Sequence, residues 1–246
     1  MPKRELAPRT VSLYADCERR FRVWLQGADP SLEGAEMYLK HLERRGLKRN
    51  TRHIIAMAIR RNCSIPVPSP GIEVPEPEYN TMEEIETLIA NNSGPLTRTA
   101  FIVTFDTGCR ISELLDMRVS RLDLERRLVK VTRKGGREEN LALGQRSVDA
   151  LSEWLKVRQS DDDLIFMDYT IRDIAYRMCA VARKCRIHFH PHMLRHSRAV
   201  HMWRSGMRLE EIAAVLGHKD LNVTRQIYAR LSVEDRAKNL DQKAPW

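Results

Sequence analysis

The sequence predicts a mainly α-helical protein with one small antiparallel β-sheet, divided into an N-terminal helical domain and a larger α+β domain. Apolar residues recur at the 3.6-residue spacing of amphipathic helices along most of the chain. The spacing changes to two in a single stretch, residues 128–143, which has glycines at its centre. Residues 65–79 contain five prolines and a glycine, which disfavour a helix and predict an extended linker between the domains.

The N-terminal domain, residues 1–64, is expected to be a small bundle of three helices. Thr10 is a suitable N-cap for the first helix and Thr51 for the third, while Gly46 is suited to end the second. Five cations lie around the turn between the second and third helices: Arg44, Arg45, Lys48, Arg49 and Arg52. The bundle is therefore expected to have a basic edge.

The second domain, residues 80–246, is expected to begin with a helix that Thr81 and Glu84 open as a capping box. A second helix over 96–107 ends at Gly108, and a third starts near Ile111. The hairpin has strands at 128–133 and 137–143, joined through Lys134-Gly135-Gly136. Further helices are predicted at residues 145–158, 171–184, 192–205, 210–216 and 222–231.

Positive charge is concentrated in two segments of this chain, whose formal net charge is +9. Residues 1–62 hold 14 Lys and Arg against 7 Asp and Glu, and residues 186–230 hold 8 against 3. Two basic segments suggest two surfaces that grip one polyanion, although solvated helix faces would give the same count. Nucleic acid is favoured over a membrane surface because neither segment has a broad apolar face.

Other classes of protein are disfavoured by what the sequence lacks. It has no run of about 18 apolar residues and no apolar stretch near its first residue, so neither a membrane span nor a signal peptide is expected, and a cytoplasmic location follows. The cysteines are odd in number and form no CxxC pair, which predicts reduced thiols: Cys17, Cys63, Cys109, Cys179 and Cys185. His188, His190 and His192 alternate along the chain but lack an acidic partner set, so no metal site is expected.

Several cationic side chains are placed so that they could hold a phosphate. His192 and Arg195 are three residues apart on one helix face, and a guanidinium offers two parallel donors to phosphate oxygens. Arg110 lies at a corner between two helices, near free backbone amides. Lys134 is at the tip of the hairpin, where it could donate a proton. Taken singly, each of these residues is at least as well explained as a surface or packing residue.

Tyr228 lies ten residues after His218 and supplies a nucleophile to this set. A phenol has a pKa near 10, so it attacks phosphorus only if its proton leaves as it reacts. Tyr228 is not on the apolar helix face formed by Ile227 and Leu231, so it is less easily explained as a residue that packs in the core. A tyrosine with several cations can cut a phosphodiester without a metal ion.

In their order and contexts, these motifs resemble those of the tyrosine recombinases of the integrase and Xer type. The resemblance covers about residues 80–232 and rests on five matching places: Thr107-Gly108-Cys109-Arg110-Ile111-Ser112-Glu113-Leu114, Lys134-Gly135, His192-Met193-Leu194-Arg195-His196, Leu216-Gly217-His218 and Tyr228. The chain departs from the family pattern at Arg133, where a glycine is usual, and lacks a common proline in the return strand. Lys130 is therefore an alternative to Lys134.

The resemblance implies a role for each matched residue. Arg110, Arg195 and His218 would hold the scissile phosphate, while Glu113 supports the site from behind. Lys134 would protonate the leaving 5′ oxygen, His192 would assist proton transfer, and Tyr228 would form a 3′-phosphotyrosyl bond. No metal ion or ATP is implied.

The resemblance also implies an architecture around DNA. Residues 1–64 would be the core-binding domain that closes a clamp on duplex DNA. Residues 232–240 would form a tail helix that packs on a neighbouring protomer, so that dimers and tetramers assemble on DNA.

Two other functions remain open from the sequence. A type IB topoisomerase-like enzyme would use the same chemistry without needing a specific DNA site. A helix-turn-helix regulator, formed by residues 210–228, would bind DNA without catalysis.

Overall fold

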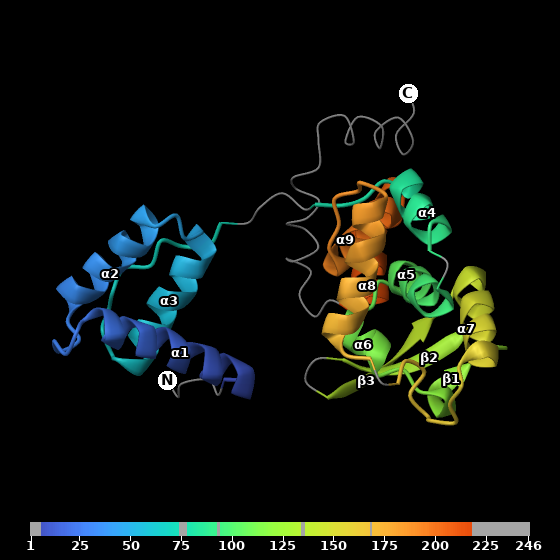
Figure 1. Cartoon of the computed structure of the whole chain (residues 1–246), viewed down its shortest axis with the longest axis horizontal. Coiled ribbons are helices and arrows are strands. Elements are labelled where there is room, and N and C mark those ends of the chain that lie inside the picture. The colour runs from blue at the N-terminus through green and yellow to red at the C-terminus, as the bar shows by residue number, and fades with distance from the viewer. Residues whose placement is uncertain (1–5, 74–77, 93, 134–135, 168, 218–246) are drawn as a thin grey trace. The chain divides into compact units, whose positions relative to one another are not determined.

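The computed structural model describes residues 6–73, 78–92, 94–133, 136–167, 169–217 of the chain. It separates into two compact units, Met1–Pro75 and Glu76–Trp246 (Figure 1). Each unit has its own apolar core.

Three helices form the first unit: α1 (Pro8–Trp24), α2 (Leu32–Arg44) and α3 (Arg49–Asn62). Phe21, Tyr38 and Ile59 are buried at its centre, and the rings of Phe21 and Trp24 pack against Tyr38. The expected bundle is present, but Thr10 and Thr51 do not cap its helices. Helix α1 already begins at Pro8, whose fixed φ and missing N–H suit a first helical turn, and α3 begins at Arg49.

Part of the proline-rich segment belongs to the first unit. Ile65 and Val67 are buried in its core, with 8% and 0% of their surface exposed. The side chain of Asn50 accepts a hydrogen bond from the N–H of Glu73 and donates one to its carbonyl, at 2.7 and 2.6 Å. The expected extended segment is thus present, without helix or strand in its described part. Its first nine residues, 65–73, pack on the three-helix bundle rather than forming a free linker.

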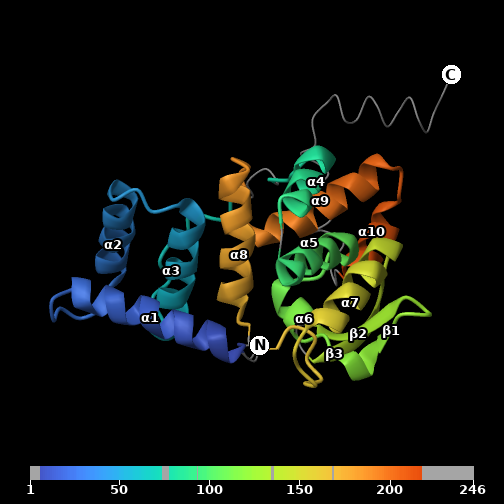
Figure 2. The same cartoon turned by 45° about the vertical axis from the view of Figure 1, so that its right-hand side comes forward.

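The second unit surrounds α5 (Pro95–Thr107), a helix buried on most of its faces (Figure 2). Helices α7 (Gln145–Val157), α8 (Ile171–Lys184) and α9 (Pro191–Arg204) pack around it, and α4 (Met82–Ala90) contacts it as well. Among the described residues, this unit also contains α6 (Ile111–Leu115) and α10 (Leu209–Leu216), with a short 3-10 turn at Val119–Arg121. The predicted capping box at Thr81 and Glu84 opens α4.

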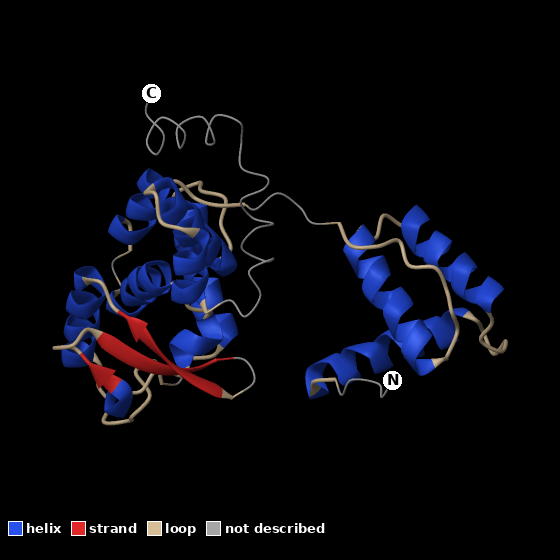
Figure 3. Ribbon diagram, turned by 180° about the vertical axis from the view of Figure 1, so that it is seen from behind, coloured by secondary structure: helices blue, strands red, loops and turns tan. Residues whose placement is uncertain are grey.

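A three-stranded antiparallel sheet lies at one end of this unit (Figure 3). The hairpin pairs β2 (Leu128–Arg133) with β3 (Arg137–Ala142), so that Val131 lies opposite Glu139. A two-residue strand, β1 (Leu122–Asp123), adds to the other edge of β2 and was not expected from the sequence. Val129, Val131 and Arg133 alternate along β2 and are all buried, so Arg133 points to the same side as the apolar core.

The predicted fold class, mainly α with a small antiparallel sheet, is confirmed. The helix expected at 222–231 and the tail helix expected at 232–240 lie outside the described residues. Within the described ranges, none of the helices is both long and apolar enough to cross a bilayer.

Candidate active site

The site is built at the end of α5, where Gly108 turns the chain toward α6. Gly108 has φ +62°, and a side chain there would collide with Leu216 at the end of α10. Thr107 stabilises the turn because its hydroxyl donates to the carbonyl of Val103 and accepts from the N–H of Cys109, at 2.6 and 3.2 Å. The positive φ and the nearby Leu216 side chain together favour glycine at this turn.

Glu113 fixes Arg110 at the start of α6. One carboxylate oxygen of Glu113 accepts the backbone N–H of Arg110 at 2.9 Å, and the other accepts its guanidinium at 2.6 Å. Glu113 is 3% exposed. Burial alone would raise the pKa of this carboxyl, but the Arg110 N–H and the charges of Arg133 and Arg110 hold its pKa below the usual value. The arginine is therefore bound to an ionised carboxylate, while 38% of its side chain stays exposed.

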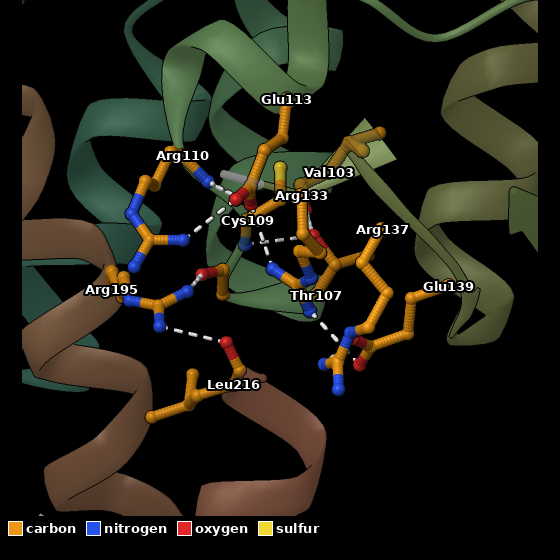
Figure 4. A network of polar contacts seen from close by, with 11 residues as sticks. Val103, Thr107, Cys109, Arg110, Glu113, Arg133, Arg137, Glu139, Arg195 and Leu216 are labelled. Atoms are coloured by element: carbon orange, nitrogen blue, oxygen red, sulfur yellow. Dashed lines mark hydrogen bonds and ion pairs between the residues drawn. The ribbon is translucent and has the colours of Figure 1, made fainter. Parts of the chain in front are cut away.

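Arg195 is a buried cation that joins three segments (Figure 4). Its side chain lies on α9 and donates to the carbonyl of Gly108 at 2.6 Å and to that of Leu216 at 2.7 Å. Arg195 is 3% exposed, and burial together with the nearby charge of Arg110 lowers its pKa to about 10. It remains charged at neutral pH, and both of its hydrogen-bond acceptors within the described chain are neutral.

His192 and His196 lie one helical turn apart on α9 and contact each other. Their ring centroids are 4.6 Å apart, with the rings nearly perpendicular. Partial desolvation, followed by the charges of Arg195 and Arg110, lowers the pKa of His192. Burial and the neighbouring His192 lower the pKa of His196 to about 4. Both imidazoles are neutral at physiological pH, so His192 can donate or accept one hydrogen bond without carrying a charge.

Arg133 is a member of this cluster that sequence reasoning assigned no role. Its guanidinium donates to Glu113 at 2.7 Å and approaches Glu139 at 3.5 Å, and only 3% of its side chain is exposed. The alternation of Val129, Val131 and Arg133 was the available signal, because it places the arginine on the inward face of β2.

The structure thus brings together four of the sequence-predicted residues: Arg110, Glu113, His192 and Arg195. The other three, Lys134, His218 and Tyr228, lie outside the described residues. Lys134 follows Arg133 directly in the sequence, and His218 follows Gly217. The alternative Lys130 is on the opposite face of β2 from Arg133, where its ammonium lies 3.7 Å from Glu138.

The described parts of the chain contain no group of three metal-binding side chains. His188 and His190 instead lie beside the carboxylate of Glu78, at 3.0 and 3.7 Å. All five cysteines are free thiols, and burial raises the pKa of Cys109, next to the site, to about 11.

The five cations expected to bind DNA in the first unit differ in their surroundings. Arg44, Arg45 and Lys48 are exposed around the end of α2 and the start of α3. Arg49 donates to the carbonyl of Pro70 at 2.7 Å, and Arg52 binds Glu43 at 2.6 Å. The first three are therefore better placed to meet a phosphate than the last two.

Residues 78–235 match the model of the phage integrase family. The chain belongs to this family. The tyrosine recombinase XerC of Haemophilus influenzae is 27% identical, over 99% of this chain and 93% of the relative. The tyrosine recombinase XerA of Thermococcus kodakarensis is 25% identical, over 93% and 86%. The predicted resemblance and the predicted enzyme class, a tyrosine-type site-specific recombinase, are confirmed.

Solved structures share the fold of this phage integrase family member. A post-cleavage complex of the XerH recombinase with a palindromic difH substrate has a TM-score of 0.77 at 18% identity, covering 94% of this chain and 79% of that one. The XerA recombinase has a TM-score of 0.63 at 21% identity, covering 98% and 94%. A lambda integrase tetramer bound to a Holliday junction has a TM-score of 0.72 at 16% identity, covering 92% and 73%.

Proposed function

We propose that this chain binds duplex DNA and cuts and rejoins it at a specific site through a 3′-phosphotyrosyl intermediate. The observation that carries the proposal is the surplus of positive charge around Arg195. The guanidiniums of Arg110 and Arg133 both contact the buried carboxylate of Glu113, and Arg195 lies close enough for its pKa to respond to the charges of all three. An anion that enters this cluster offsets part of this surplus.

A phosphodiester is the anion that fits the proposed chemistry. Its non-bridging oxygens gain negative charge as phosphorus becomes five-coordinate, and fixed guanidinium donors in a dry site stabilise that charge strongly. Arg195 is already held by two carbonyls and Arg110 by Glu113, so neither needs to be reorganised as the reaction proceeds. Cations of the chain thus do the work that a metal ion does elsewhere, and no cofactor is required.

The sequence completes the proposed reaction with residues outside the described ones. The phenol oxygen of Tyr228 forms a bond to phosphorus as the bond to the 5′ oxygen breaks, and Lys134 supplies the proton to that oxygen. His218 donates to a phosphate oxygen, and neutral His192 assists the proton transfer by accepting the proton that the phenol of Tyr228 loses. Because the intermediate is a phosphoester, a 5′ hydroxyl can later displace Tyr228 without ATP.

The proposed partner is double-stranded DNA, with assembly of dimers and tetramers upon it. Two relatives of known structure support this, one solved on a difH substrate and one as a tetramer on a Holliday junction. The exposed cations Arg44, Arg45 and Lys48 of the first unit provide a second basic surface. We propose that residues 1–64 form the DNA core-binding domain, residues 65–79 the linker and residues 80–246 the catalytic domain. Residues 65–73 of the linker pack on the N-terminal bundle.

A nicked suicide duplex tests the proposal, because the short strand released after cleavage diffuses away and leaves the adduct trapped. With duplexes that span candidate sites, we expect a denaturant-stable protein–DNA adduct that forms in EDTA and is absent in Tyr228→Phe. An adduct that needs Mg²⁺, or that persists in Tyr228→Phe, would overturn the mechanism. Relaxation of supercoiled DNA that lacks any cognate site would favour a topoisomerase instead.

A further inference from the structure

Arg133 lies where three segments of the site meet. Its guanidinium binds Glu113 of α6 at 2.7 Å, and its own backbone ends β2. It also packs against the backbone that ends α10, since a Cβ at Gly217 would lie 2.7 Å from its guanidinium carbon. Gly217 has φ +65° and leaves just enough room for the arginine.

Glu113 is shared between two arginines on its two oxygens. One oxygen faces the guanidinium of Arg110, and the other faces that of Arg133 and the Arg110 N–H. If Arg133 were absent, the whole charge of the buried carboxylate would act on Arg110. A guanidinium whose charge is balanced by a nearby carboxylate attracts a phosphate less.

We propose that Arg133 is a positioning residue for the cleavage reaction: it offsets the charge of Glu113, so that Arg110 and Arg195 keep their positive charge for the scissile phosphate, and it holds the ends of β2 and α10 together. The inference rests on the proposed function, because it assigns the phosphate to those two arginines. Only 3% of the Arg133 side chain is exposed, so we assign it a role that acts through Glu113 rather than through direct contact with the phosphate.

The place of Arg133 in the chain adds to this role. The residue after it is Lys134 and the residue after Gly217 is His218, both assigned to the reaction by sequence. A contact between Arg133 and Gly217 therefore fixes the residue that precedes Lys134 in the chain against the residue that precedes His218.

Stability alone gives little reason for an arginine at this position. A buried ion pair is often no more stabilising than an apolar residue of similar size. The Nε–H of Arg133 is buried and has no hydrogen-bond partner among the described residues, which adds a cost. Val129 and Val131 show that the same strand face accepts apolar side chains.

Four variants test the inference through the rate of adduct formation at saturating DNA and, separately, the affinity for DNA. Arg133→Met removes the charge and keeps the length, while Arg133→Lys keeps the charge. Glu113→Gln with Arg133→Met removes both buried charges. Arg137→Met is the matched control, because Arg137 also binds Glu139 from the same hairpin but has 53% of its side chain exposed, where water screens it.

We expect Arg133→Met to slow adduct formation on the order of 100-fold, as loss of a phosphate donor does, with DNA affinity within about 3-fold of the parent. The double variant should be faster than Arg133→Met by about 10-fold, because it removes the unbalanced carboxylate. Arg133→Lys should stay within about 10-fold of the parent and Arg137→Met within about 3-fold.

The inference is overturned if Arg133→Met reacts as fast as Arg137→Met, or if Arg133→Lys and the double variant are both as slow as Arg133→Met. Circular dichroism establishes that each variant is folded. If Arg133→Met does not fold, the rate of Arg133→Lys relative to Arg137→Met decides, and a loss beyond about 100-fold overturns the inference. Absence of any adduct in the parent chain would refute the proposed function itself, whatever the variants do.

Discussion

Arg195 shows how one side chain can serve both folding and chemistry. Its two hydrogen bonds join the turn after α5 to the end of α10, and no carboxylate of the described residues contacts its guanidinium directly. The planar guanidinium donates to both carbonyls at once, a geometry that the ammonium of lysine cannot reproduce.

Arg195→Lys should therefore slow adduct formation on the order of 100-fold even though the charge is kept. The rate at saturating DNA measures this. Arg198→Lys is the control, since Arg198 is on the same helix and faces Asp106 and the ring of Phe105 rather than the cluster. Equal rates for the two variants would show that the fork of Arg195 does not matter.

His196 makes part of the stability depend on pH. Its pKa falls from about 6.5 in the unfolded chain to about 4 in the fold, because it is partly buried beside His192. The folded state thus binds this proton less tightly. The contribution of neutral His196 to the free energy of unfolding is fully present above about pH 6.5, and it is lost as the pH falls from there toward about 4.

His196→Gln should lessen the loss of stability between pH 6.5 and pH 4 by on the order of 2 kcal/mol. Urea unfolding at a series of pH values measures it. The pKa values of His192 and His201 are lowered too, so part of the acid sensitivity will remain. His188→Gln is the control, because 76% of the His188 side chain is exposed. If His196→Gln and His188→Gln lose the same stability between pH 6.5 and pH 4, His196 is not a source of the acid sensitivity.

Helix spacing and the family resemblance singled out Arg110, Glu113, His192 and Arg195 in the sequence, and the structure places these four side chains in one cluster. Arg133 was read as a departure from the family pattern, and its role depends on contacts that no local pattern reveals. The carboxylate that it binds is twenty residues away, and the backbone it packs on is at Gly217.

At the scale of elements, the turn between α5 and α6 decides whether the site can assemble. Gly108 combines a left-handed backbone with a close approach of the Leu216 side chain. Gly136 in the hairpin has a similar backbone, with φ +79°, but open space around its Cα. Comparing alanine substitutions at Gly108 and Gly136 therefore separates the cost of the positive φ from the cost of the clash with Leu216.

Gly108→Ala should destabilise the chain by about 2 to 4 kcal/mol, and Gly136→Ala by about 1 kcal/mol. Thermal or urea unfolding measures the difference. Adduct formation should also fall in Gly108→Ala, because its carbonyl anchors Arg195. If the two substitutions cost the same, the packing of α10 on this turn is not what requires glycine.

Element boundaries were predictable where capping and periodicity agreed. Helix α8 was placed at its observed limits, 171–184, and α4 opens with the predicted box. The starts of α1 and α3 were misplaced because a threonine was taken as the cap where Pro8 or Lys48 leads the helix. Strand β1 is two residues long, too short for any alternation to show.

At the scale of the whole molecule, the proposed function needs the basic edge of the first unit to meet DNA. Arg44, Arg45 and Lys48 are exposed there. Cations already bound to carboxylates, such as those at the end of α1, release fewer counterions when DNA arrives.

Replacing Arg44, Arg45 and Lys48 with glutamine should reduce the slope of log affinity against log salt by about 3, because each phosphate contact contributes about 0.9. Fluorescence anisotropy at several salt concentrations measures the slope. The control replaces Arg19, Arg20 and Arg22, which pair with Asp16 and Glu18, and should change the slope by less than half as much. A larger effect in the control would place the DNA surface elsewhere on the bundle.

The division of the chain into two units followed from the prolines, but the exact limit did not. Prolines predict where helices cannot form, whereas Ile65 and Val67 show that such a segment can still pack on a core. Across the molecule, Tyr79 and Asn80 attach the start of the second unit to α9, through Arg204 and Ser197.

The most direct measurement of the central claim is the identity of the residue joined to DNA. The trapped adduct is digested with protease and nuclease, and the nucleotide-bearing peptide is sequenced by mass spectrometry. The account predicts a 3′-phosphate ester on Tyr228, formed by the parent chain in EDTA and strongly reduced in Arg195→Lys. A nucleotide attached to any other side chain, or through a 5′-phosphate, would contradict it.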